Sequence, residues 1–163
     1  MDKKVIIRQA TIVDFKDIQR LNHKLFVKEY RDYDKTLHTR FPYTKNGKEY
    51  FKRRITNHRD GFVAVAEIDS KMIGYLIGGL QARKISRIPA RYAELENMIV
   101  EQKFRGKKIG SKLITYFFEW CKQKKVDYVK VIASSQNFRA QKLYRKMGFG
   151  DYDVELLKKI SIK

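Results

Sequence analysis

The sequence predicts a mixed α/β fold, in which a central mixed sheet of six to seven strands is flanked on both faces by about four helices. Short apolar runs that alternate like strands recur between segments whose apolar residues follow the helical period. The chain has 163 residues, 43% of them hydrophobic, and no linker-like or low-complexity segment divides it. We therefore expect a single domain over residues 1–163, large enough to bury a core without disulfides or metals.

Local signals predict the N-terminal elements. Residues 5–7 predict a short first strand, and Thr11, followed by Asp14 three residues later, resembles the capping box that starts a helix. The apolar residues that follow have the spacing of one helix face, and they are Phe15, Ile18, Leu21, Leu25 and Phe26. Residues 31–47 are polar and rich in turn formers, so we expect a loop before a second, charged helix over residues 49–58.

The middle of the chain predicts three strands and a helix. Residues 62–68 and 72–80 predict two strands joined by the turn Asp69-Ser70-Lys71, and residues 92–100 predict a fourth strand. A third helix is indicated by an apolar face made of Ile109, Leu113, Ile114, Phe117, Trp120 and Cys121.

The C-terminal part continues the alternation. Residues 128–133 are rich in β-branched side chains and predict a fifth strand. Residues 137–147 predict a fourth helix that ends at Gly148, a residue suited to a left-handed cap. One or two further strands are expected over residues 149–157 and 159–162.

The turn before the third helix is the most informative functional signal. The strand over residues 92–100 leads into Arg105-Gly106-Lys107-Lys108-Ile109-Gly110, which opens the helix. Backbone N–H groups converge at a helix N-terminus, and the helix dipole favours negative charge there. Cations oppose this dipole, so a purely structural turn does not explain the cluster Lys103, Arg105, Lys107 and Lys108. We therefore expect the turn to hold a phosphate-rich cofactor.

Four features together resemble the GNAT acetyltransferase superfamily over nearly the whole chain. The family's cofactor signature, Arg/Gln-x-x-Gly-x-Gly/Ala, is matched by residues 105–110, and the strand Glu96-Asn97-Met98-Ile99-Val100 precedes it. The later pattern Asn137-x-x-Ala140-x-x-Leu143-Tyr144-x-x-x-Gly148-Phe149 and the turn Ile73-Gly74-Tyr75 also match. The resemblance implies a GNAT-like domain that uses acetyl-CoA as acetyl donor.

By this resemblance, the strand contacts the pantetheine arm through the backbone of Met98, Ile99 and Val100. The pyrophosphate lies on the turn and the helix start, formed by Arg105, Gly106, Lys107, Lys108, Ile109, Gly110 and Ser111. Lys108 stands where the family usually has its first glycine. We expect helical dihedrals there, with the backbone N–H still available, because a required positive φ would make lysine weaken binding. A Cβ at Gly110 would be the worse intrusion.

Two residues are expected to carry the chemistry. Glu96 shares a strand face with Glu94, and is either a carboxylate paired with a lysine or a general base acting through water, as in the polyamine acetyltransferases that this strand resembles. A lysine-like amine, with a pKa near 10.4, is neutral only about once in 2,500 molecules at pH 7, so a base helps. By the resemblance, the Tyr144 hydroxyl lies near the CoA sulfur and protonates the leaving thiolate.

Other candidates keep two interpretations. Asn137 is a helix N-cap, a cofactor contact, or both. By family analogy Tyr30 and Tyr33 line the acceptor site with Glu94, although a solvated loop explains the tyrosines equally well. Cys121 is expected in the core, because it sits at an apolar helical position. A covalent acyl-cysteine route would need a base partner, and none is evident. No metal site is expected, since His23, His38 and His58 are not spaced like the histidines of a metal-binding motif.

The formal net charge is +19, and its basic residues are spread along the chain. Such a field attracts CoA-type cofactors, nucleic acid, ribosomes or acidic proteins; the alternative is a solubilising surface without a polyanionic partner. A single cysteine excludes an internal disulfide and favours a cytoplasmic setting. No apolar run is long enough to span a bilayer, so no membrane partner is expected.

These observations predict an acetyl-CoA-dependent N-acetyltransferase that works by direct attack in a ternary complex. The acceptor is a primary amine, either a small amine or polyamine, or a protein or peptide amine. The alternative is a non-catalytic acyl-CoA-binding module, or a polyanion- or nucleic-acid-binding module, on the same fold. A homodimer is compatible with the resemblance, and the sequence does not specify the oligomeric state.

Overall fold

The computed structural model describes residues 4–82 and 87–160. Its sheet has the strand order β1-β2-β3-β4-β5, formed by β1 (Ile6–Gln9), β2 (Gly61–Ile68), β3 (Lys71–Leu80), β4 (Tyr92–Val100) and β5 (Tyr128–Val131). The pairs from β1 to β4 are antiparallel, whereas β4 and β5 are parallel. The predicted mixed sheet is confirmed.

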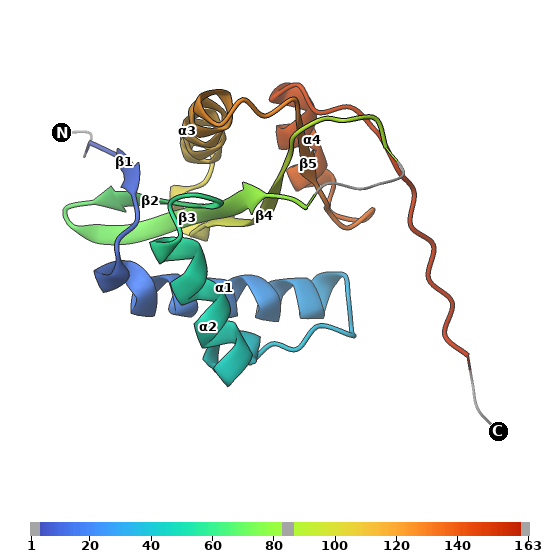
Figure 1. Cartoon of the computed structure of the whole chain (residues 1–163). Coiled ribbons are helices and arrows are strands. Elements are labelled where there is room, and N and C mark those ends of the chain that lie inside the picture. The colour runs from blue at the N-terminus through green and yellow to red at the C-terminus, as the bar shows by residue number, and fades with distance from the viewer. Residues whose placement is uncertain (1–3, 83–86, 161–163) are drawn as a thin grey trace.

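Helices cover both faces of this sheet (Figure 1). On one face lie α1 (Phe15–Asp32) and α2 (Lys45–Thr56), and on the other lies α3 (Ile109–Gln123); α4 (Phe138–Lys146) follows β5. Each face has its own buried cluster: α1 and α2 contribute Ile18, Leu21, Phe51 and Ile55, and α3 contributes Ile109, Leu113, Ile114, Phe117, Trp120 and Cys121. Cys121 thus lies in the core as predicted, and burial raises the pKa of its thiol to about 12.

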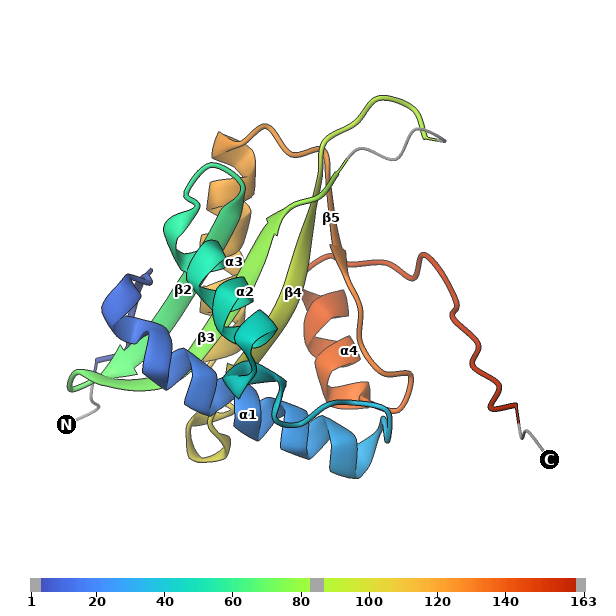
Figure 2. The ribbon, with the colours of Figure 1, turned by 60° about the horizontal axis from the view of Figure 1, so that its bottom comes forward.

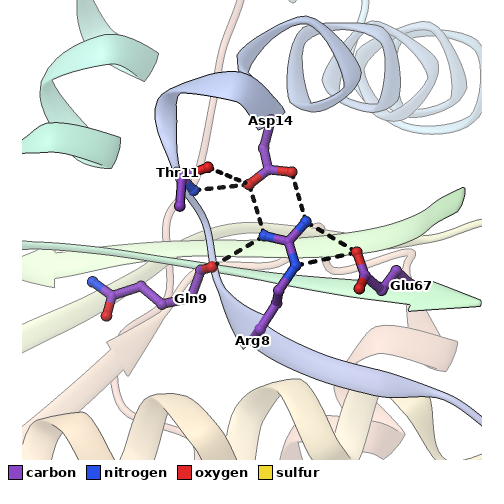
Figure 3. Close-up of polar contacts among 5 residues, drawn as sticks. All are labelled: Arg8, Gln9, Thr11, Asp14 and Glu67. Atoms are coloured by element: carbon purple, nitrogen blue, oxygen red, sulfur yellow. Dashed lines mark hydrogen bonds and ion pairs between the residues drawn. The ribbon is translucent and has the colours of Figure 1, made fainter. Parts of the chain in front are cut away.

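The start of α1 is fixed to the sheet by an ionic network (Figure 3). Asp14 ends a single 3-10 turn (Ile12–Asp14), and its carboxylate accepts the backbone N–H of Thr11 at 2.8 Å, as the capping box predicted. The Arg8 guanidinium lies between two carboxylates, donating to both oxygens of Asp14 at 2.8 and 2.9 Å and to Glu67 of β2 at 2.9 Å. These contacts hold the pKa of Asp14 below its ordinary value.

We expect Arg8→Met to lower the free energy of unfolding by about 1–3 kcal/mol at pH 7, because Asp14, 6% exposed, loses its charge partner. The depressed pKa means that Asp14 contributes its stability above about pH 4 and loses it as the pH falls. Denaturant unfolding of both proteins between pH 3 and 8 should therefore show the difference shrinking at acid pH. Arg59→Met, at a largely exposed ion pair, is the matched control; a difference that does not change with pH contradicts the assignment.

Helix α2 begins earlier than predicted, at Lys45 rather than at residue 49. The Thr44 side chain accepts the backbone N–H of Gly47 at 3.0 Å, which caps the helix inside the segment expected to be a loop. Pro42 lies in a 3-10 turn just before it and is buried. As a result α2 presents Tyr50 and Arg54 to the sheet.

The expected C-terminal strands are not formed in the described residues. The segment 149–160 carries no strand and leads away from the domain (Figure 1), and residues 161–162 of the second predicted strand lie outside the described residues. Three of its apolar side chains, Val154, Leu156 and Leu157, are 85–90% exposed. Strand propensity alone does not stabilise a strand without a neighbour, so the sheet ends at β5 in the described chain.

Candidate active site

A cleft opens where β4 and β5 separate. The two strands pair only over residues 92–95 and 128–131, and after β5 the chain turns into α4 (Figure 2). The β3–β4 register shifts between Ile77 and Gly78, which leaves Glu96 as an extra residue in a bulge of β4. The bulge and the separation leave the second half of β4 without a β5 partner. A cleft of about 720 Å³ lies there, lined by β4, α1, α4 and the start of α3.

Most of the predicted site residues meet in this cleft. Its lining includes Tyr33, Glu94, Glu96, Met98, Ile99, Val100, Arg105, Gly106, Lys108, Ile109, Gly110, Ser111, Asn137 and Tyr144. Lys107 and Tyr30 are not part of the lining. Tyr30 lies in the last turn of α1 rather than in the predicted loop; it is 40% exposed, with the Lys35 ammonium 5.1 Å from its ring centroid.

Cations surround the turn that opens α3. The Arg105 side chain donates to the Val100 carbonyl at 2.8 Å, which fixes the guanidinium against the end of β4. Burial and the nearby charge of Arg139 lower the pKa of Arg105. Two like charges therefore face the cleft close to a helix N-terminus, whose first N–H groups have no partner within the helix. A bound anion would relieve the repulsion and accept from these donors.

Lys108 corrects one prediction, because its backbone is left-handed, with φ 59° and ψ 13°, rather than helical. It is the residue directly before α3, where the chain reverses after Gly106 at φ 82°. This conformation is disfavoured for a residue with a Cβ. The family's usual glycine is thus explained by backbone geometry, and lysine here carries a conformational cost. The Lys108 side chain still lines the cleft.

We expect the Lys108→Gly variant to be about 1 kcal/mol more stable than Lys108→Ala, because only glycine adopts a positive φ without penalty. Both variants remove the charge, so their difference isolates the backbone contribution. Chemical denaturation of the two variants measures it. Equal stabilities would mean that the position is not strained. If both variants lose acetyl-CoA affinity by the same factor, that loss measures the contribution of the Lys108 charge to binding.

Asn137 directly precedes α4, Tyr144 lies within it, and both line the cleft. Asn137 is the N-cap: its side chain accepts the backbone N–H of Ala140 at 3.2 Å, and it also lines the cleft. Tyr144 packs edge-on against Phe149, with ring centroids 5.7 Å apart, and faces the cleft. Burial, with a smaller contribution from the charge of Glu29, raises the pKa of Tyr144 to about 12. Its hydroxyl is therefore a proton donor at neutral pH.

Glu96 is held by partners that the sequence did not reveal. Arg54 of α2 donates to both of its carboxylate oxygens, with Nε at 3.1 Å, and the Tyr50 hydroxyl donates to the same carboxylate. The side chains of Arg54 and Glu96 are each 14% exposed. The network continues to Asn97, which donates to the Tyr50 hydroxyl at 3.2 Å. The expected lysine partner is instead an arginine, and this carboxylate is fixed in place.

A further carboxylate, Glu29, was not singled out from the sequence. It lies on α1, four residues after Leu25 and seven after the buried Asn22, so it continues the sheet-facing side of the helix. The sequence does contain a signal for Glu29, namely a charged residue on a side of the helix whose other residues face inward. It lines the same cleft as Glu94 and Glu96. Within the two described segments, no three His, Cys, Asp or Glu side chains are grouped to hold a metal ion.

The sequence from residue 19 to residue 149 matches the model of the Acetyltransferase (GNAT) family. The chain belongs to the GNAT acetyltransferase family. The resemblance inferred from the Arg105–Gly110 turn is thereby confirmed, and the predicted GNAT-like mixed sheet is the observed one, although the described residues form five strands rather than six or seven.

Two archaeal GNAT relatives bear the name uncharacterized N-acetyltransferase. MJ1207 of Methanocaldococcus jannaschii is 30% identical over 153 residues, which cover 93% of this chain and 63% of the relative. A protein of Archaeoglobus fulgidus is 28% identical over 138 residues, or 85% of this chain and 88% of the relative. The chain thus spans less than two thirds of the first relative's length.

Solved structures share the GNAT fold. The tetramutant of the BH1408 protein from Bacillus halodurans superposes with a TM-score of 0.82 at 18% identity, covering 95% of this chain and 99% of that one. The aminoglycoside N-acetyltransferase AAC(6')-Iy in complex with CoA gives 0.77 at 15% identity, covering 99% and 98%. At these identities the likeness shows the fold. In the part of the chain that the structure describes, no helix is long and apolar enough to cross a membrane.

Proposed function

We propose that this GNAT protein, as one domain over residues 1–163, transfers the acetyl group of acetyl-CoA to a primary amine. The observation that carries the proposal is the cleft between β4 and α4, which joins a cationic turn at one end to a buried tyrosine hydroxyl and carboxylates at the other. Acetyl-CoA is the acetyl donor of the family, and the structural neighbour AAC(6')-Iy is a CoA complex.

The cofactor's phosphates would lie on the turn before α3, where Arg105 and Arg139 supply charge and the helix start supplies N–H groups. The pantetheine arm would extend along the unpaired edge of β4 at Met98, Ile99 and Val100. The thioester would then lie near the bulge at Glu96, between β4 and Tyr144. Asn137, whose amide nitrogen is not used by the cap, contributes a further donor beside the cofactor.

The acceptor nitrogen attacks the thioester carbonyl directly, without an enzyme-bound acyl group. A backbone N–H of β4 stabilises the oxyanion, and Tyr144 donates its proton to the departing thiolate. The attacking nitrogen must first lose a proton, so a carboxylate in the cleft serves as base. Glu96 was predicted for this role, acting through water. Its contacts with Arg54 and Tyr50 favour instead a role in holding the bulge of β4 in position.

The charge distribution in the cleft favours a cationic acceptor. The cations at the α3 turn and on α4 are Arg105, Lys108, Arg139, Lys142 and Lys146, whereas β4 and α1 contribute Glu29, Glu94 and Glu96. Lys28 of α1 also lines the cleft, and it is paired with Asp32. One end therefore suits phosphates and the other an ammonium group. A small amine or polyamine fits this arrangement, and a protein or peptide amine is the close competitor. A cytoplasmic location, a homodimer and a polyanionic partner remain predictions from sequence.

Calorimetric titration with acetyl-CoA at moderate salt, with dephospho-CoA for comparison, tests the proposal. We expect micromolar binding of acetyl-CoA, weaker binding of dephospho-CoA, and thiol release in the presence of at least one amine of a panel. Binding without turnover would favour the non-catalytic acyl-CoA module. Absence of binding, together with retention on nucleic acid that falls steeply with salt, would favour the polyanion-binding alternative.

A further inference from the structure

The three carboxylates of the cleft differ in whether they have partners. Glu96 is paired with Arg54, and Glu94 is 3.3 Å from the Lys130 ammonium of β5. Within the described part of the chain, no hydrogen bond or ion pair involves the Glu29 carboxylate. Its neighbour Lys28 is instead paired with Asp32 at 3.0 Å. Glu29 is thus the carboxylate of the cleft that is available to a ligand.

The position of Glu29 follows from the geometry of α1. The helix crosses the sheet, and its inward side buries Ile18 and Leu21 in the core. Near its C-terminal end the same side passes the separated ends of β4 and β5, so the next inward position faces the cleft rather than the core. A charged residue is tolerated there because a ligand or water can reach it. Because this position faces the cleft, packing in the core does not explain why it carries a carboxylate.

The electrostatic environment supports this assignment. Burial raises the pKa of Glu29; Lys28 opposes the shift and Asp34 adds to it. Its charge in turn contributes to the raised pKa values of Tyr144 and Tyr75, and Tyr144 lines the same cleft. The other charged and titratable groups that line the cleft with it are Lys28, Tyr33, Glu94, Glu96, Arg105, Lys108, Arg139, Lys142, Tyr144 and Lys146. A carboxylate with a raised pKa is a better base near neutral pH than an ordinary one.

We propose that Glu29 binds the acceptor's ammonium group and takes its proton, while Glu96 is a positioning residue. This rests on the proposed acetyl transfer. One proton moves from the ammonium to a Glu29 oxygen, and the freed nitrogen lone pair attacks the thioester carbon. As the C–S bond breaks, Tyr144 protonates the thiolate and regains a proton that the nitrogen loses on becoming an amide. The Glu29 proton then leaves to solvent, so the net reaction releases one proton.

The test compares kcat/KM for n-butylamine, a mimic of a lysine side chain, between pH 6.5 and 10 in the wild type, Glu29→Gln and Glu96→Gln. We expect Glu29→Gln to lose about 100-fold at pH 7 and less than about fivefold near pH 10, where the amine deprotonates without help. Glu96→Gln should show a loss that does not change with pH. Glu119→Gln, on the exposed side of α3, is the matched control.

Acetyl-CoA affinity and thermal stability separate this role from a structural one. Because burial raises the pKa of Glu29, its ionised form costs stability at neutral pH. The melting temperature of Glu29→Gln at pH 7.5 should therefore equal or exceed that of the wild type, with acetyl-CoA affinity unchanged. A wild type that turns over, combined with a flat or absent loss in Glu29→Gln, overturns the role of Glu29 alone. A wild type that neither binds acetyl-CoA nor releases thiol overturns the proposed function, and the role of Glu29 with it.

Discussion

Replacing Tyr144 with phenylalanine is expected to lower turnover about 100-fold while leaving acetyl-CoA affinity within about twofold. Burial raises the pKa of this tyrosine to about 12, so the hydroxyl is protonated throughout the neutral range and can donate to a departing thiolate. Phenylalanine removes the donor and keeps the ring, which packs edge-on against Phe149. Steady-state thiol release gives kcat, and calorimetry gives the affinity for acetyl-CoA.

The control for this variant is Tyr128→Phe, at an exposed tyrosine of β5 outside the cleft. It should leave both quantities unchanged. The raised pKa also predicts that kcat of the wild type does not fall through ionisation of Tyr144 below about pH 11. An unchanged kcat in Tyr144→Phe would remove the acid role. A loss of affinity and melting temperature at constant kcat would leave Tyr144 as a packing residue.

Features with local or periodic signals were predictable from the sequence. The strand, turn and helix around Arg105–Gly110 follow from period-2 and period-3.6 apolar patterns and from the glycines, and their spacing from Tyr144 carried the family resemblance. Because β4 and α3 are adjacent in the chain, the turn between them is determined by residues that are close in sequence. The prediction of a phosphate-binding turn therefore needed no long-range contact.

Features that depend on tertiary contacts were not predictable. Glu96 and Arg54 are 42 residues apart, and nothing in either segment indicates their pairing. Glu29 lines the cleft only because β4 and β5 separate beyond residues 95 and 131. The left-handed backbone of Lys108 is set by the reversal between β4 and α3, against the preference of lysine itself. Residues 149–160 have a strand-like pattern, but they form no strand in the described part of the chain.

Replacing Arg54 with methionine is expected to lower the free energy of unfolding by about 3–5 kcal/mol, the largest stability effect that we predict for a polar residue here. Methionine fills much of the volume, so the loss comes mainly from the Glu96 carboxylate, which keeps Tyr50 but loses the cation paired with it. Gly79 shows how closely the structure accommodates this arginine, because a Cβ there would lie 2.5 Å from the Arg54 Nη1 atom. Activity should fall as well, since the bulge of β4 carries the proposed oxyanion donor.

A double-mutant cycle decides whether the unpaired charge is the cause. Glu96→Gln in the Arg54→Met background removes that charge while keeping an acceptor for the Tyr50 hydroxyl, so we expect it to recover more than half of the lost stability. Denaturant unfolding at pH 7 of the wild type, the single variant and the double variant provides the measurement. If the single and the double variant show equal deficits, the arginine stabilises α2 through packing of its aliphatic chain, and the ion pair contributes little.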